Sequence, residues 1–161
     1  MISKEQLQKF QSQSKNGLRY EQKGEAILIF NKLNEKIAEL NLAHRNLGIY
    51  NDAWFGFVTG EEYKEIMDGP YYFYFAESKC SKKMCNTLGL EGGMEPETSE
   101  WFNNYLFPKM LNAGLKYNAI VIPENIFAQQ TMEDFEANLG NKLARLFPNE
   151  TEATNWLNSV N

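Results

Sequence analysis

The stretch that decides the fold class is Tyr117-Asn118-Ala119-Ile120-Val121-Ile122, which Pro123 ends. Its last four residues are apolar without interruption. A strand with one solvated face alternates apolar and polar residues, so an unbroken apolar run is typical of a strand that helices cover on both faces. This stretch therefore predicts a strand inside a helix-covered sheet.

Earlier in the chain, further strands are predicted at 26–30, 36–42 and 47–57. The first is a short apolar run, and the second alternates apolar and polar residues with period two. A turn around 43–46 joins the second and third, which predicts an antiparallel hairpin. Later in the chain, 83–88 and 142–147 are also predicted to be strands.

Helix signals lie between these strands. Thr59-Gly60-Glu61-Glu62 has the spacing of a capping box, so a helix is predicted to begin there, and Gly69-Pro70 is expected to interrupt it. The composition of 71–76, Tyr-Tyr-Phe-Tyr-Phe-Ala, favours a strand, but a family resemblance described below favours a helix. Further helices are predicted after Pro96, from Thr131 to Gly140 and after Asn149, with a kink at Pro108.

The resulting order is hairpin, helix, strand, helix, strand, helix, strand, helix. This order predicts an α/β fold in which a single-layer mixed sheet, an antiparallel hairpin followed by parallel strands, is packed with helices. Residues 26–161 are expected to form that domain, and residues 1–25 a polar N-terminal arm. Two interpretations of the arm stay open: a partly ordered tail with a short helical stretch, or a segment docked in or exchanged with another copy.

The composition excludes several classes of function. The chain has 161 residues, of which 16 are basic and 21 acidic, for a formal net charge of −5. This balance argues against binding to nucleic acid or to anionic membranes. No apolar run reaches the roughly 20 residues that span a bilayer, so membrane insertion is not expected. The chain starts without an apolar stretch of signal type and has only two cysteines, so we expect a cytoplasmic location.

Four stretches together resemble the SpoIIAA-like family in their order and spacing. This family belongs with the STAS domains of anti-sigma-factor antagonists and is loosely grouped with the CRAL-TRIO lipid-binding fold. The resemblance covers residues 36–160, and it implies a STAS-like sheet and a helix at 71–78. The stretches are Trp54–Tyr63 (WFGFVTGEEY), Met94–Trp101 (MEPETSEW), Ala113–Glu124 (AGLKYNAIVIPE) and Glu152–Leu157 (EATNWL).

The same resemblance implies where a phosphorylated serine would lie, namely at the start of the helix after the central strand. Here Pro96 or Glu97 takes that position, and Thr98 and Ser99 follow one or two residues later. Thr98 and Ser99 are therefore the candidate phosphorylation sites, because a helix N-terminus favours a phosphate. The carboxylate of Glu97 would interact with the same helix dipole.

A binding site is predicted at the carboxyl ends of the parallel strands, where α/β proteins usually hold ligands. The glycine-rich loop 89–93 belongs to this edge, but its Glu91 and the following Glu95 would repel a phosphate, so no nucleotide or other cofactor is predicted. The candidate ligand- or partner-binding residues are Asn86, Glu97, Thr98, Trp101, Pro123 and Glu124.

No catalytic or metal-binding group is predicted. The only histidine, His44, lies at the hairpin turn without a second histidine or a cysteine nearby in sequence. Cys80 and Cys85 have no second pair, and a structural zinc site needs four ligands.

Three functions follow as hypotheses. The first is a non-enzymatic regulatory or protein-interaction module of STAS-like type that forms a homodimer. The second is a carrier or sensor of a lipid or small apolar ligand, which the 14% aromatic content and the lipid-binding kinship favour. The third is a small enzyme of unknown reaction, which would need a deep pocket with two converging polar groups of perturbed pKa.

Overall fold

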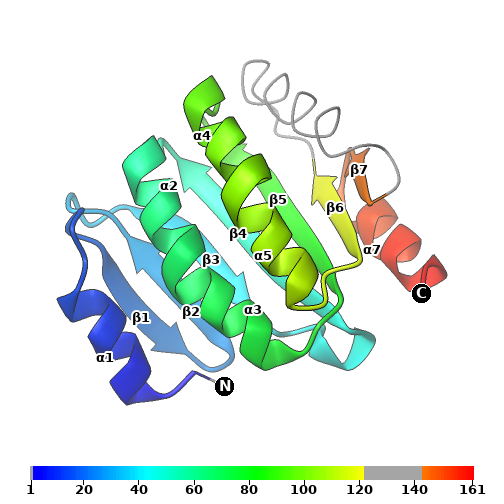
Figure 1. Cartoon of the computed structure of the whole chain (residues 1–161), viewed down its shortest axis with the longest axis horizontal. Helices are drawn as coiled ribbons and strands as arrows, with labels where there is room; N and C mark the ends of the chain where they lie inside the picture. Colours follow the sequence, from blue (N-terminus) through cyan, green and yellow to red (C-terminus); the bar gives the residue numbers. More distant parts are fainter. Residues whose placement is uncertain (1, 122–142) are drawn as a thin grey trace.

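The computed structural model describes residues 2–121 and 143–161. Within them lies a sheet of seven strands whose order in space equals their order in the chain (Figure 1). Strands β1 to β4 pair antiparallel and β4 to β7 pair parallel, which confirms the predicted mixed sheet. The strands are β1 (Arg19–Lys23), β2 (Ala26–Phe30), β3 (Lys36–Asn41), β4 (Ile49–Gly56), β5 (Lys82–Leu90), β6 (Tyr117–Val121) and β7 (Ala144–Phe147).

Helices cover both faces of the parallel part of the sheet. The connections β4–β5 and β5–β6 join neighbouring parallel strands, so right-handed crossovers place their helices on the same face. Figure 1 shows these helices side by side across the sheet. They are α2 (Gly60–Ile66) and α3 (Tyr72–Ser78), then α4 (Pro96–Trp101) and α5 (Phe107–Asn112).

The last helix, α7 (Glu150–Ser159), packs on the opposite face. Its Ala153 and Leu157 form a second, smaller core with Met84 and Ala119. Because side chains alternate along a strand, the residues next to Met84 in β5 point to the face that α2 to α5 cover. The two faces of β5 therefore belong to different layers of the core.

The α2–α3 segment settles the open question at 71–78. The capping box of Thr59 is formed, and a π-helical turn, Met67–Tyr71, joins the two helices. Gly69 departs from helical geometry with φ −117° and ψ −110°, which is the predicted interruption. The following residues are helical, so the helix reading is confirmed and the strand reading is wrong. The apolar residues that suggest a strand are buried at helical spacing instead, at Tyr71, Tyr74 and Phe75.

The other predicted helices have different outcomes. Pro96 begins α4 as expected, and Pro108 lies in the first turn of α5, beyond a second π-helical turn, Phe102–Leu106. The Asn149 side chain accepts a hydrogen bond from the amide of Glu152 and caps α7. The helix predicted from 131 to 140 lies outside the described residues.

The N-terminal segment differs from a loosely held arm. Residues Lys4–Ser12 form α1, and Arg19–Lys23 form β1, which pairs with β2 along its whole length. Strand β1 was not predicted, because Tyr20 is its only apolar residue. Pairing with β2, rather than its own pattern, orders this edge strand.

Glu65 of α2 fixes the connection between α1 and β1. Its carboxylate accepts hydrogen bonds from the Ser14 hydroxyl at 2.6 Å, the Lys15 amide at 2.8 Å and the Asn16 amide at 3.2 Å. The Tyr20 hydroxyl donates to it at 3.4 Å. A carboxylate that accepts hydrogen bonds from several donors at once stabilises a turn more than a single neutral hydrogen bond does.

We therefore expect Glu65→Ala to lower the free energy of unfolding by about 1–3 kcal/mol, because it leaves several donors without their charged partner. Amide hydrogen exchange at Lys15 and Asn16 should accelerate together. Glu61→Ala is the matched control, since Glu61 lies one turn earlier with its side chain 77% exposed. Equal effects of the two substitutions would contradict this account of the N-terminal segment.

Candidate functional site

The register of the parallel strands gathers polar side chains on the face that α2 to α5 cover. Lys83 of β5 lies opposite Tyr50 of β4 and Asn118 of β6. Two residues further along β4 and β5, Asp52 lies opposite Cys85. Since residues two apart share a face of a strand, all five side chains point into the same layer.

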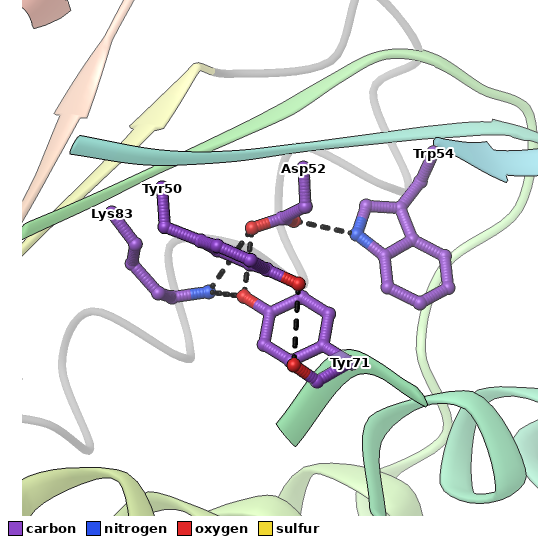
Figure 2. Close-up of polar contacts among 5 residues, drawn as sticks. All are labelled: Tyr50, Asp52, Trp54, Tyr71 and Lys83. Carbon is purple, nitrogen blue, oxygen red and sulfur yellow. Dashed lines mark hydrogen bonds and ion pairs between the residues drawn. The ribbon is translucent and has the colours of Figure 1, made fainter. Parts of the chain in front are cut away.

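Asp52 and Lys83 form a buried ion pair (Figure 2). The Lys83 Nζ and Asp52 Oδ2 atoms are 3.5 Å apart, and the two side chains are only 3% and 1% exposed. The Tyr71 hydroxyl connects them, because it accepts a hydrogen bond from Lys83 Nζ at 2.6 Å and donates one to Asp52 Oδ2 at 2.7 Å. The pair is thus held mainly through this hydroxyl.

Two more aromatic residues fix the network. Trp54 Nε1 donates to Asp52 Oδ1 at 2.8 Å, so both oxygens of the carboxylate are bonded. The Tyr50 hydroxyl donates to the backbone carbonyl of Tyr71 at 3.2 Å, and the two rings meet edge to face at 5.1 Å. Figure 2 shows that these side chains converge from β4, β5 and the helical turn before α3.

This environment keeps the neighbouring acids protonated. Burial, and then the negative charge of Asp52, raises the pKa of Tyr71 well above its ordinary value. The same two causes raise the pKa of Tyr50 and of the Cys85 thiol, while Lys83 acts in the opposite direction on Cys85. At neutral pH these groups are hydrogen-bond donors rather than anions.

A cavity of about 180 Å³ lies beside the network, and residues at the N-termini of α2 and α4 form part of its wall. Its volume suits a compound of about one aromatic ring, since cavities of about 150 Å³ accommodate benzene. Apolar side chains make up most of the wall, and polar side chains line it both on the sheet and at the starts of α2 and α4. The apolar set includes Trp54, Val58, Met67, Leu90, Met94, Phe102 and Ile120; the polar set is Asp52, Lys83, Thr87 and Asn118 on the sheet and Thr59, Glu95 and Thr98 at the helix starts.

Asn118, one of the residues that line this cavity, carries a buried polar atom without a partner among the described residues. The residue is 3% exposed, and its Oδ1 atom has no hydrogen-bond partner among the residues that the structure describes. Thr87, which also lines the cavity, donates its hydroxyl to the Val121 carbonyl at 2.7 Å. A buried amide oxygen without a donor is uncommon and needs an explanation.

The residues predicted from the resemblance and the topology do not all meet at this cavity. Thr98 lines it, and Gly60 packs so closely against Thr98 that an added Cβ would lie 2.6 Å from the Thr98 hydroxyl oxygen. Asn86 lies on the opposite face, where its amide donates to Glu150 of α7 at 2.7 Å. Glu97 has a side chain 84% exposed and lies 3.9 Å from Lys64.

Among the remaining predicted residues, Trp101 and Ser99 do not line the cavity. Trp101 is partly buried against the main core, with its ring 6.4 Å from Tyr63 and 5.4 Å from Tyr105. Thr98 and Ser99, the candidate phosphorylation sites, are both buried. Pro123 and Glu124 lie outside the described residues.

Asp52, Lys83 and Asn118 were not predicted as site residues from the sequence. A signal existed, since Asp52 is the only acidic residue within the strand predicted at 47–57, and Lys83 and Asn118 lie within predicted strands. Charged side chains are almost never fully buried without a partner. A charged residue in each of two strands of a sheet that helices cover indicates such a pair.

The structure shows no centre of another kind within the described ranges. No group of three or more His, Cys, Asp or Glu residues is placed there to hold a metal ion. Cys80 and Cys85 are both free thiols, and His44 Nδ1 contacts the Asn51 amide at 3.2 Å. In residues 2–121 and 143–161, no helix has the length and apolar character to cross a membrane.

Comparisons of the chain with protein-family models, curated proteins and solved structures found no match.

Breaking the buried pair should destabilise the fold strongly. We expect Lys83→Met or Asp52→Leu alone to cost about 3–5 kcal/mol, because each leaves one buried charge unpaired, and the double substitution to cost less than either. Lys109→Met is the control, because the Lys109–Asp68 pair is 35% and 36% exposed, and it should cost about 1 kcal/mol or less. Additive losses in urea unfolding would refute the coupling.

The buried phenols should determine the alkaline limit of stability. Their pKa values in the folded chain exceed the unfolded value of about 10, so their contribution is complete below that pH and is lost as the pH rises further. We expect part of the tyrosinate absorbance to appear only with unfolding, in the same step as the circular dichroism change. Tyr50→Phe should reduce that step by one tyrosine. Ionisation of all eight tyrosines before unfolding would contradict this expectation.

Proposed function

We propose that this chain is a ligand-binding module, a sensor or carrier, whose cavity holds a small compound with an apolar body and one polar edge. The observation that carries the proposal is the cavity itself, which joins an apolar wall to a buried ion pair. Specific small-molecule sites have this composition, with a few placed polar groups in a mostly apolar pocket.

The energetic cost of the ion pair supports this proposal. Removing both charges from water costs several kcal/mol for each ion, and well-packed apolar residues in their place are often as stable. The network of Asp52, Lys83 and Tyr71 is therefore not needed merely to fill the core. A role in recognising a ligand accounts for its position at the wall of a cavity.

The rim of the cavity is compatible with entry of a small compound. Gly92, Gly93 and Met94 line it on the loop between β5 and α4. The neighbouring Phe57 is 69% exposed, and an added Cβ at Gly92 would lie 3.1 Å from its ring. This loop has little side-chain bulk, so small displacements would open a path.

The geometry favours binding over catalysis. The polar side chains of Asp52 and Lys83 both line the cavity. The pKa values of the neighbouring Tyr71 and Cys85, however, are shifted further from neutrality. A general base or a thiolate nucleophile works best when its pKa lies near or below the working pH. Both groups therefore stay protonated at neutral pH, and neither is suited to accept a proton from a ligand.

A regulatory role of STAS-like type is compatible with this proposal. Thr98 lies in the first turn of α4, one or two residues after the position at which the SpoIIAA-like resemblance implies a phosphorylated serine, and it also lines the cavity. A bound ligand would contact the start of that helix directly. We therefore keep membership of the SpoIIAA-like family and recognition of a protein partner as parts of the proposal.

Two substitutions at Cys85 test whether the cavity binds ligands. Cys85→Met extends a side chain into the cavity, whereas Cys85→Ala at the same position leaves it open. We expect phenol to shift the amide resonances of Val58 and Thr87 in the wild type and in Cys85→Ala. Cys85→Met should weaken this binding at least about tenfold.

The fold of each variant is checked by circular dichroism before the titration. Phenol binding that is unchanged in Cys85→Met would place the probe elsewhere and overturn the proposal. So would the absence of saturable shifts in the wild type up to the solubility limit of a panel of one-ring compounds.

A further inference from the structure

We infer that the ligand is an organic cation, with a one-ring body inside the cavity and a protonated amine at the mouth of the cavity, beside Glu95. This inference rests on the proposed function and names the charge class of the ligand. The amine would lie where the cavity meets solvent, and the ring would lie toward the buried ion pair of Asp52 and Lys83.

The cavity opens between the loop after β4 and the loop before α4. Of the described residues that line it, only Thr59, Gly93 and Glu95 are exposed, and all the others are buried or partly buried. Gly93 has no side chain, and the Thr59 hydroxyl accepts a hydrogen bond from the Glu62 amide at 3.1 Å. Glu95 is therefore the only charged residue at the mouth within the described part of the chain.

The charged residues that line the cavity leave one negative charge uncompensated. Asp52 and Lys83 form the buried ion pair and compensate each other. Glu95 is the third, and its carboxylate has no hydrogen bond or ion pair with any described residue. This carboxylate lies within a side-chain length of the wall, well inside the Debye length of about 8 Å at physiological ionic strength. It therefore attracts a cation at the mouth whichever way the side chain points.

Two carboxylates next to the mouth add to this negative charge. Gly60 and Thr98 line the cavity, and the adjacent residues Glu61 and Glu97 have side chains 77% and 84% exposed. Their carboxylates lie 4.0 and 3.9 Å from the same amine, Lys64 Nζ. One positive charge cannot compensate two negative ones, so this group stays negative. A cavity bordered by charges of one sign raises the local concentration of oppositely charged ligands.

The helix starts at the mouth are poorly suited to an anion. At α2, the buried carboxylate of Glu62 already accepts a hydrogen bond from the Thr59 amide at 2.9 Å. At α4, Pro96 has no N–H group, and the Thr98 amide donates to the Glu95 carbonyl at 3.0 Å. These backbone donors, which could hold an anion at a helix start, are therefore missing or already in use.

The test compares three phenols whose para substituents are cationic, neutral and anionic, by isothermal titration calorimetry at neutral pH. They are 4-hydroxybenzylamine, 4-hydroxybenzyl alcohol and 4-hydroxybenzoate. We expect the amine to bind about tenfold more tightly than the alcohol, and the benzoate to bind most weakly, because of the charge at the mouth. Raising the ionic strength from about 0.1 M to about 1 M should reduce this preference, since the Debye length falls from about 10 Å to about 3 Å.

Glu95→Gln should reduce the preference for the amine to about threefold or less. This variant should fold, because the Glu95 side chain makes no capping hydrogen bond. Glu25→Gln is the matched control, since it removes the same charge from an exposed residue. Glu25 lies in the turn between β1 and β2, near the start of β4, whereas the mouth follows the end of β4. The control should keep the tenfold preference.

The outcomes separate this inference from the proposed function. If phenol binds as proposed but the three substituted phenols bind equally, the inference is wrong and the function stands. If Glu25→Gln lowers the preference as much as Glu95→Gln does, the preference reflects the net charge of the chain, and the inference is wrong as well. The inference also fails if the amine binds Cys85→Met as tightly as the wild type, because its ring then lies outside the cavity. If no one-ring compound binds, both are wrong.

Discussion

The interaction on which this structure depends is the ion pair between Asp52 and Lys83, completed by the hydroxyl of Tyr71. It joins β4, β5 and the helical turn before α3, so the sheet and its covering layer are connected by charge as well as by apolar contact. Each partner is stable in the interior only while the others hold it. The kink at Gly69 and Pro70 immediately precedes Tyr71 in the same turn.

This constraint also shapes the cavity. Strand register fixes Asp52, Lys83 and Asn118 on the sheet, and the apolar wall comes largely from the helices and the loop before α4. A ligand would therefore meet a rigid polar floor and a more adjustable apolar cover. In such an arrangement, the polar groups of the sheet would select the ligand and the apolar cover would move to admit it.

Sequence patterns predicted most of the architecture but only part of the site. Strand β6 and the capping box at Thr59 were recognisable because their signals are local. Strand β1 was not, because long-range pairing with β2 orders it. Asn86 was expected at the site and Lys83 was not, since a strand covered on both faces gives no periodic signal of which side chain faces which layer. Which side chains line the cavity depends on which face of the strand each one occupies.

The most direct test of the central claim is nitrogen NMR of the lysine side chains at neutral pH. The account predicts one ammonium signal with slow proton exchange and a hydrogen bond to an aromatic hydroxyl, which disappears in Lys83→Met and changes in Tyr71→Phe. A Lys83 signal that exchanges with water as fast as those of the surface lysines would contradict the buried network and everything inferred from it.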